Sequence, residues 1–388
     1  MRISRLAVDH FRSWQALVLD LEPGVNILQG RNGLGKTNLV EALEVLSTGS
    51  SHRASSSAPL VQRGQARATV RANAQEAGRT TTYELTIPVR GANRARIDGG
   101  PSLYMRDLVG RVPSVTFSPE DQRLVSGDPS GRRSFLDQTA SQLDPAYYQA
   151  KQDVSHLAQQ RSALLKRLSR AESAGADEGD RQADLSGLEV WTGQFIQRGM
   201  DLTARRQRLV QTLQGPLAQI YERLAGAGQE ASMTYEPSFA EVLQAGPGPE
   251  AAAEISRHFQ RVWPGELARG VNLLGPQRDD LSFSLNGLPA KEYASNGEEW
   301  TLALALRLAE HQILSQEGGQ APILILDDVF AQLDDERRGQ ILDFAREQPQ
   351  ALITVAAPGD LPALEGAHLI NVAQLAQRQR EALGEAEA

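Results

Sequence analysis

The chain has 388 residues, of which 40% are hydrophobic, and a formal net charge of −8 at pH 7. This length is sufficient for more than one core, and no apolar run approaches the roughly 18 residues that cross a bilayer. The lack of cysteine excludes disulfides, thiolate catalysis and Cys-ligated metals, and because the six histidines have no ligand spacing, any metal is expected to arrive with a nucleotide. The first residues lead directly into strand-like sequence instead of a signal peptide, so we expect a cytoplasmic protein.

The charge is unevenly distributed along this acidic chain. Residues 1–133 carry 18 Lys and Arg against 12 Asp and Glu. A basic first part is compatible with a localised DNA-binding face, although uneven charge is also common in proteins that bind no nucleic acid. The candidate DNA contacts are Arg53, Arg63, Arg67, Arg132 and Arg133. Each of these arginines is also compatible with a solvated surface charge or with a partner in an ion pair.

The N-terminal sequence predicts a hairpin followed by a phosphate-binding loop. Apolar residues alternate over 3–8 and 17–21, and the run 25–28 predicts a buried strand before the helical pattern 39–46. Between strand and helix lies GRNGLGKT, a full match to GxxxxGKT. Backbone N–H groups can wrap phosphates only where Cβ atoms are missing, and the start of a helix adds unpaired donors. The loop therefore predicts the following roles: Gly30, Gly33 and Gly35 shape it, Lys36 reaches the β- and γ-phosphates, and the Thr37 hydroxyl holds Mg²⁺.

Residues 50–112 are rich in strand-forming stretches punctuated by glycine, which predicts an antiparallel layer beside the nucleotide core. A further strand is expected over 112–117. It leads into Ser118-Pro119-Glu120-Asp121, which is typical of a helix start.

The middle of the chain predicts a helical arm. Residues 131–225 have a helical pattern, interrupted by a small, acidic, loop-like segment at 171–180. The stretches 144–170 and 184–224 are long enough to pair as antiparallel helices, and their leucine stripes are explained by packing between helices. A loop at 245–249 precedes another predicted helix at 250–263.

The last third returns to an α/β pattern. A strand is expected at 281–285 with the turn Asn286-Gly287, and a helix at 300–314. The apolar run 321–326 predicts a strand buried on both faces and ends in two acids. A helix over 336–346, strands over 352–355 and 369–372 and a frayed tail complete the prediction.

The acid pair has a catalytic interpretation beside a phosphate-binding loop. Acids also stand at strand ends for solubility, so the pair alone is a weak signal. Together with the loop, it predicts that Asp327 binds the metal and Asp328 orients or deprotonates the attacking water.

Two further stretches narrow the class: Ser295-Asn296-Gly297 opens the helix before the acid pair, and Ala331-Gln332-Leu333-Asp334 follows it. In this order the motifs resemble the ABC-type ATPase heads of the SMC-like branch, and within that branch the RecF family of bacterial recombination mediators. The stretches that carry the resemblance are 10–13, 30–38, 51–53, 117–121, 132–137, 274–281, 301–310 and 326–330.

The resemblance implies an α/β P-loop head, in which a mixed sheet with flanking helices and an antiparallel β layer carry an inserted short helical arm. The expected division is 1–130 for the first ATPase lobe, 131–265 for the arm, 266–375 for the rest of the head and 376–388 for the frayed tail. The resemblance also implies more nucleotide contacts, with those of the last three residues made across a dimer. These contacts are Arg12, Asn32, Asn38, Ser295, Gly297 and Asp334.

In function, the resemblance implies an ATP-dependent head-to-head dimer that binds duplex DNA at gaps or single-strand/duplex junctions. It also implies work with RecR and RecO in placing RecA on gaps during DNA replication, repair, recombination and the SOS response, with slow, DNA-stimulated ATP hydrolysis. A transporter subunit is disfavoured because about 290 residues separate the loop from the acid pair. A long-armed SMC protein is excluded because the insert is too short for an extended coiled coil.

The chain departs from the family pattern where the partner's phosphates are expected. Glu298-Glu299-Trp300 stands in place of Gln-Gln-Arg, Gln277 replaces a histidine, and the stretch 352–357 ends without a histidine that would sense the γ-phosphate. Ser295 and Glu298 form a capping-box pattern that explains the helix start without ATP. A carboxylate about 4 Å from phosphate costs roughly 4 kcal/mol at an effective dielectric near 20. The alternative hypothesis is therefore a nucleotide-gated scaffold of the same fold with little or no turnover.

Overall fold

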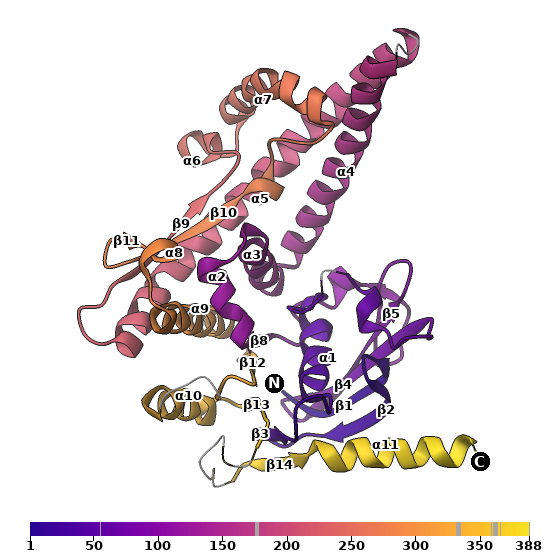
Figure 1. Ribbon diagram of the computed structural model, residues 1–388, viewed down its shortest axis with the longest axis vertical. Coiled ribbons are helices and arrows are strands. Elements are labelled where there is room, and N and C mark those ends of the chain that lie inside the picture. Colours follow the sequence, from indigo (N-terminus) through magenta and orange to yellow (C-terminus); the bar gives the residue numbers. More distant parts are fainter. Residues whose placement is uncertain are drawn as a thin grey trace.

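The computed structural model describes residues 1–387 except 55, 175–177, 331–334, 358, 360–363 and 365. Figure 1 shows a body that contains two large sheets and a helical arm that projects from it. None of the helices in this described part of the chain has both the length and the apolar character needed to cross a membrane.

A five-stranded, entirely parallel sheet forms the centre of the body, in the order β14-β3-β13-β12-β8. Its strands are β3 (Gly24–Gln29), β8 (Ser114–Phe117), β12 (Ile323–Asp327), β13 (Gln350–Val355) and β14 (His368–Asn371). Every residue of β12 is buried, which confirms the strand predicted from the run 321–326. Only β13 separates β3 from β12, so the phosphate-binding loop and the acid pair leave the sheet at the same edge.

The second layer is a six-stranded antiparallel sheet in the order β2-β1-β4-β5-β6-β7. Its strands are β1 (Arg2–Phe11), β2 (Trp14–Asp20), β4 (Arg67–Glu76), β5 (Arg79–Pro88), β6 (Arg94–Ile97) and β7 (Leu103–Tyr104). Helix α1 (Lys36–Thr48) lies between the two sheets, and its apolar residues share a core with β1, β4 and β12. Because α1 is packed on both sides, its first turn is held rigidly at the sheet edge.

Helices cover the other face of the parallel sheet. Helix α9 (Asn296–Glu317) lies next to β8, and α10 (Asp335–Glu347) next to β3 and β13. The short helices α2 (Arg123–Ser126) and α8 (Ala290–Tyr293) and the longer α3 (Pro129–Leu143) connect this layer to the arm.

The arm is built on α4 (Pro145–Ala174) and α5 (Glu178–Ala225), with α6 (Glu241–Ala245) and α7 (Pro249–Arg269) packed against it. At 1.5 Å per residue, α5 is about 72 Å long. Leu164, Leu165, Leu168 and Leu188 form a buried cluster between the helices, as the leucine stripes predict. The segment 171–180 is not a loop throughout, because α4 continues to Ala174 and α5 begins at Glu178, and residues 175–177 lie outside the described part.

Two expectations about boundaries need revision. Strand β9 (Ala231–Glu236) pairs with β10 (Asp280–Leu285), which continues through the turn Asn286-Gly287 to β11 (Leu288–Pro289). The expected division at residue 265 therefore cuts through one sheet, and we propose that the arm unit extends to residue 289.

The C-terminal residues expected to be frayed belong to helix α11 (Val372–Glu387). This helix runs along β2 and β3, with Leu375 and Ala376 packed on the core. Gln379 Oε1 accepts a hydrogen bond from the Gln15 backbone N–H at 2.9 Å, so the helix is attached to the sheet.

Candidate functional site

The loop between β3 and α1 has the backbone that phosphate binding requires. Gly33 and Gly35 have φ values of 84° and 92°, in the left-handed region that favours glycine. A Cβ at Gly35 would lie 2.8 Å from both Ser13 Oγ and Trp14 Nε1, whereas a Cβ at Gly33 would meet nothing within 4 Å. Gly35 is therefore required by packing, while Gly33 leaves the mouth of the loop open to a ligand.

Lys36 lies inside this loop with 5% of its surface exposed. Its Nζ donates to the Gly30 carbonyl at 2.5 Å and to Asn32 Oδ1 at 3.1 Å. The ammonium group thus lies at the centre of the cradle, in contact with two residues that the sequence assigned to the nucleotide.

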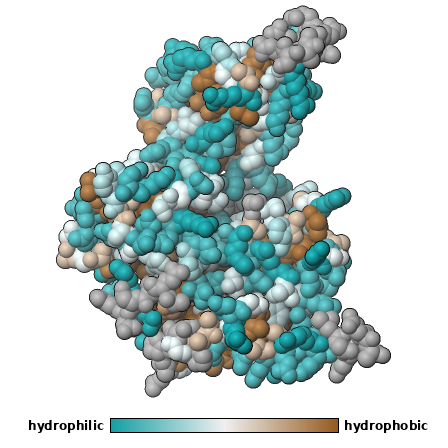
Figure 2. Space-filling model, in the orientation of Figure 1, coloured by the Kyte–Doolittle hydropathy of each residue, from teal (hydrophilic) through white to brown (hydrophobic). Residues whose placement is uncertain are grey.

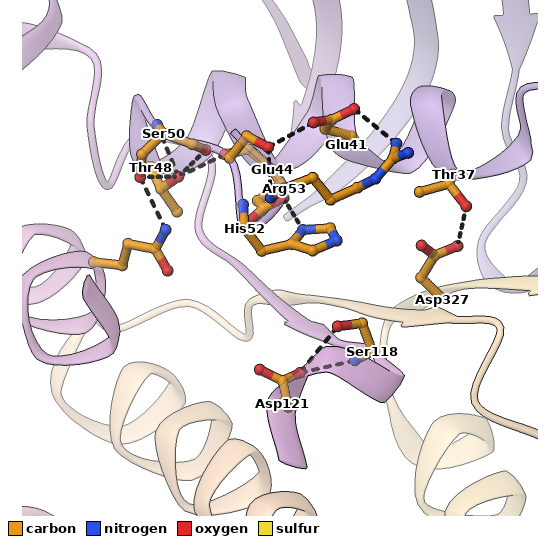
Figure 3. A network of polar contacts seen from close by, with 12 residues as sticks. Thr37, Glu41, Glu44, Thr48, Ser50, His52, Arg53, Ser118, Asp121 and Asp327 are labelled. Carbon is orange, nitrogen blue, oxygen red and sulfur yellow. Dashed lines mark hydrogen bonds and ion pairs between the residues drawn. The ribbon is translucent and has the colours of Figure 1, made fainter. Parts of the chain in front are cut away.

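Thr37 and Asp327 are 290 positions apart in the sequence but adjacent in the structure (Figure 3). Thr37 Oγ1 donates to Asp327 Oδ1 at 3.0 Å, and Thr354 Oγ1 donates to the same oxygen at 2.6 Å. Burial raises the pKa of Asp327, and the two hydroxyl groups oppose that shift. Hydroxyl and carboxylate oxygens are ligands that Mg²⁺ prefers, so this pair fits the predicted metal.

Asp328 follows with φ of 55°, a left-handed conformation that asparagine and aspartate tolerate best. Its backbone N–H donates to Thr354 Oγ1 at 2.9 Å. Thr354 therefore links the two acids: its hydroxyl donates to Asp327 and accepts from the backbone N–H of Asp328.

A second polar cluster on α1 involves Arg12, Asn38 and Arg53. The Arg12 guanidinium bonds both oxygens of Glu41, a side chain with no exposed surface, at 2.9 and 2.5 Å. Arg53 Nη1 bonds Asn38 Oδ1 at 3.0 Å and Glu41 at 3.2 Å. Arg12 and Arg53, assigned to nucleotide and DNA respectively, are thus brought together by a buried carboxylate that sequence reasoning did not single out.

The start of α9 forms the predicted capping box. The Ser295 N–H and hydroxyl donate to Glu298 Oε2 at 2.8 and 2.7 Å, and Ser295 Oγ accepts from the Glu298 N–H at 3.4 Å. Glu299 accepts from Ser126 Oγ at 3.2 Å, and the buried Trp300 packs edge-on against Phe117 with ring centroids 4.7 Å apart. The unusual stretch 298–300 is therefore occupied with contacts inside the chain.

The remaining predicted residues have different environments. A Cβ at Gly297 would lie 3.7 Å from the Arg337 guanidinium, which places a cation beside the helix start. In the described part of the chain, no hydrogen bond connects Ser295 or Gly297 to the loop at 30–37. Asp334 lies outside the described residues.

A buried ion pair connects α9 to the turn after β8. Arg307 on α9 bonds Asp121 Oδ1 at 2.6 and 3.1 Å and Glu310 Oε2 at 2.8 Å. Asp121 belongs to the 3₁₀ turn η3 (Pro119–Gln122), whose capping box with Ser118 confirms a helical start there. Burial lowers the pKa of Arg307 but the two carboxylates raise it more, so the guanidinium stays charged. Arg307 was visible in the sequence only as part of the stretch 301–310.

The five candidate DNA contacts separate into two groups. Arg132 is only 3% exposed and bonds both Asp280 oxygens at 2.7 and 2.9 Å, so the prediction of a DNA contact is not supported there. Arg133 donates to the Asp279 carbonyl at 2.8 Å, and burial lowers its pKa. Arg53, Arg63 and Arg67 are exposed.

Comparison with known proteins identifies relatives of this chain. The protein-family model described as the RecF/RecN/SMC N terminal domain matches residues 2–377. A protein of Bifidobacterium adolescentis called DNA replication and repair protein RecF is 62% identical over 386 residues, covering 99% of this chain and 94% of the relative. A protein of the same name from Beutenbergia cavernae is 42% identical over 388 residues, which cover 95% of this chain and 97% of the relative.

The solved structures that resemble this chain carry the same protein name as these sequence relatives. A structure described as the recombination mediator protein RecF-ATPrS in the RecFOR pathway matches with a TM-score of 0.82 at 27% identity, covering 96% of both chains. A second, described as RecF-ATP in the same pathway, matches with a TM-score of 0.81 at 26% identity over 95% of both chains.

Proposed function

Because this chain belongs to the RecF family of SMC-like ABC-type ATPases, we propose that it is an ATP-dependent DNA-binding mediator of recombinational repair. In this proposal two copies dimerise on ATP and Mg²⁺, bind duplex DNA at gaps or junctions and hydrolyse ATP slowly. RecR-like and RecO-like proteins are the proposed partners, since the solved relatives are described as members of the RecFOR pathway.

The observation that supports this proposal most is the hydrogen bond between Thr37 and Asp327, next to the loop in which the Lys36 side chain lies. A bound Mg²⁺ would neutralise charge on the phosphates at that point. Thr37 and Asp327 would hold it, Lys36 would contact the β- and γ-phosphates, and Asp328 would orient or deprotonate the attacking water. Thr354 fixes both acids relative to the loop, which favours this division of roles.

The start of α9 presents charges of both signs to a partner's phosphates. Hydrogen bonds fix the two carboxylates that would repel those phosphates, Glu298 at Ser295 and Glu299 at Ser126, and the bonds from Ser295 lower the pKa of Glu298, so its charge remains. The Arg337 guanidinium near Gly297 adds positive charge at the same helix start. We therefore propose that exposed Ser295 and half-buried Gly297 face the γ-phosphate held by Lys36 of the second copy.

Replacing Ser295 by aspartate is expected to abolish ATP-dependent dimerisation. Aspartate caps a helix as well as serine does, so α9 should stay intact, whereas the added carboxylate would repel the phosphate. Sedimentation velocity with and without ATP would show a doubling of mass for wild type and for Ser295→Thr, but not for Ser295→Asp. An aspartate variant that dimerises like wild type would contradict the proposed role of Ser295.

The proposed DNA surface is one end of the antiparallel sheet. Strand pairing places Arg67 opposite Pro88, Thr86 opposite Arg94, and Arg94 opposite Tyr104. The half-exposed Tyr104 ring lies 4.2 Å from the Arg94 guanidinium and 4.9 Å from that of Arg106. We define the basic end as the arginines gathered there: Arg63, Arg67, Arg90, Arg94 and Arg106.

Few acidic side chains form ion pairs with the arginines of the basic end. In the part of the chain that the structure describes, Asp9 pairs with Arg71, Asp107 is 3.9 Å from Arg106, and no salt bridge involves Arg63, Arg67, Arg90 or Arg94. Arg106 also bonds Gln149 on α4 at 2.8 Å, so the basic end adjoins the base of the arm. Figure 2 shows one face of the molecule, which is largely hydrophilic with small apolar patches.

Removing two charges from the basic end is expected to weaken DNA binding and flatten its salt dependence. The variant Arg94→Gln/Arg106→Gln should lower the slope of log K against log salt by roughly 0.9 for each phosphate that the protein no longer neutralises. The matched control is Arg2→Gln/Arg79→Gln, which removes the same charge from the opposite end of the sheet, where Arg2 pairs with Gln75 and Glu76 with Arg79. Equal slopes for the two variants, measured by fluorescence anisotropy on gapped duplex, would disprove this placement.

A further inference from the structure

His52 is a largely buried side chain to which the proposed mechanism assigns no role. It follows α1 and is fixed by one carboxylate: Glu44 accepts the His52 backbone N–H at 3.0 Å and contacts ring Nδ1 at 2.6 Å. About 10% of the His52 side chain and 4% of the Glu44 side chain are exposed. The ring therefore has a defined orientation, which Glu44 sets from α1.

The other ring nitrogen has no such partner. His52 Nε2 is buried and makes no hydrogen bond. Burial lowers the pKa of His52, but attraction and hydrogen bonding by Glu44, assisted by Asp121 and Asp327, raise it to about 9. The ring is thus protonated at neutral pH and both nitrogens are donors. A buried donor without a partner is costly and calls for a ligand or a water molecule.

The acids around the ring are already occupied. Asp121 is bonded by Arg307 and Ser118, and Asp327 by Thr37 and Thr354. Figure 3 shows the ring between Glu44 and the Ser118–Asp121 turn, with the edge away from Glu44 on the side of Asp327. Nε2 is therefore a donor at the margin of the candidate phosphate site.

The neighbouring strand does not supply an equivalent donor. The single hydroxyl proton of Thr354 at the end of β13 is used by Asp327. Lys36, on the far side of the loop, is held by Gly30 and Asn32. A terminal phosphate between Lys36 and Asp327 would thus find its additional positive donor on the segment after α1.

We infer that His52 is a phosphate-contacting residue of this site, whose Nε2–H donates to an oxygen of the terminal phosphate of bound ATP. The inference rests on the proposed ATP function and adds to it a residue that distinguishes ATP from ADP. Since ADP lacks the terminal phosphate, the contact strengthens ATP binding selectively.

Two amide substitutions separate this role from a structural one. Asparagine retains a donor near the position of Nδ1, facing Glu44, whereas glutamine retains one near Nε2. His52→Asn should weaken binding of ATPγS roughly ten- to hundredfold and of ADP less than twofold, the size expected for a charge-assisted hydrogen bond. His52→Gln should keep most of the preference for ATPγS. The control is His258, whose ring Nδ1 also contacts a glutamate, Glu241 on α6, at 3.1 Å, so His258→Asn should change neither affinity.

The possible results distinguish a failure of the proposed ATP function from a failure of the proposed role of His52. Fluorescence titration that finds no ATPγS binding to wild type would refute the proposed function itself. Wild type that binds while His52→Asn binds equally well, or loses ATPγS and ADP affinity equally, would refute the role of His52 alone. As a second readout, a protected imidazole N–H resonance of ¹⁵N-histidine-labelled protein should appear with ATPγS and be missing in His52→Asn, and its absence from wild type would also refute the inference.

Discussion

Lys36→Met is expected to reduce ATP turnover at least about 100-fold, because it removes the positive donor placed for the phosphates. The Lys36 ammonium is held between the Gly30 carbonyl and Asn32 Oδ1, so its position is set before a nucleotide arrives. Methionine has a similar length and suits a buried position, so the fold should survive. Phosphate release in the presence of gapped DNA, together with binding of a fluorescent ATP analogue, measures the effect.

Asp328→Asn is the companion variant that separates binding from chemistry. Asparagine tolerates the left-handed φ of residue 328 and keeps the N–H that bonds Thr354, so ATP binding should stay within about twofold of wild type. Turnover should fall roughly 100-fold or more, because the amide cannot act as a base. If Lys36→Met or Asp328→Asn hydrolysed ATP as wild type does, the ATPase assignment would be wrong. A wild type that binds ATP with scarcely any turnover would favour the scaffold hypothesis.

Arg206→Met is expected to destabilise the protein by about 3–5 kcal/mol, since it leaves buried Asp279 without its cation and buried Asp137 with only Lys151, whose Nζ lies 3.4 Å away. Arg206 on α5 is 3% exposed and bonds Asp137 of α3 at 2.8 Å and Asp279 at 2.7 Å. It also bonds the Pro276 carbonyl at 2.8 Å, while Tyr147 and Tyr235 donate to the two acids. Burial raises the pKa of Asp137, but Arg206, Lys151 and the Tyr147 hydroxyl together more than reverse that shift, so losing Arg206 removes the largest stabilisation of this buried charge.

The neighbouring Arg205 provides the control for this prediction. Its guanidinium is partly exposed and pairs with the half-exposed Asp144 and Asp201. Arg205→Met should therefore cost less than about 1 kcal/mol. Urea unfolding of both variants, followed by tryptophan fluorescence and circular dichroism, measures the difference. A loss for Arg206→Met within about 1 kcal/mol of that for Arg205→Met would show that the buried network contributes little net stability.

Local signals in the sequence located most elements of the ATPase body. The glycines of the loop, the apolar run that became β12, the turn Asn286-Gly287 and the capping box at Ser295 each depend on contacts within a few residues. The C-terminal helix was missed because its polar composition resembles a tail, and it is held by packing on β2 and by a bond from Gln15, 364 positions away. We propose a boundary at 289 instead of 265 because β9 and β10 pair in the folded chain although helices α6 and α7 separate them in the sequence.

The loop, the strand that carries the acid pair and the family to which both belong follow from the order of amino acids alone. The partner of each charged side chain does not, and it is known only from the folded chain: Arg132 is buried on Asp280, 148 positions away, and Arg12 and Arg53 share Glu41. The same holds for Nε2 of His52, which is buried without a partner near the acid pair. The physical reason is range: backbone preferences and apolar periodicity act between near neighbours, whereas an ion pair or a buried donor depends on which distant segments the fold brings within about 3 Å.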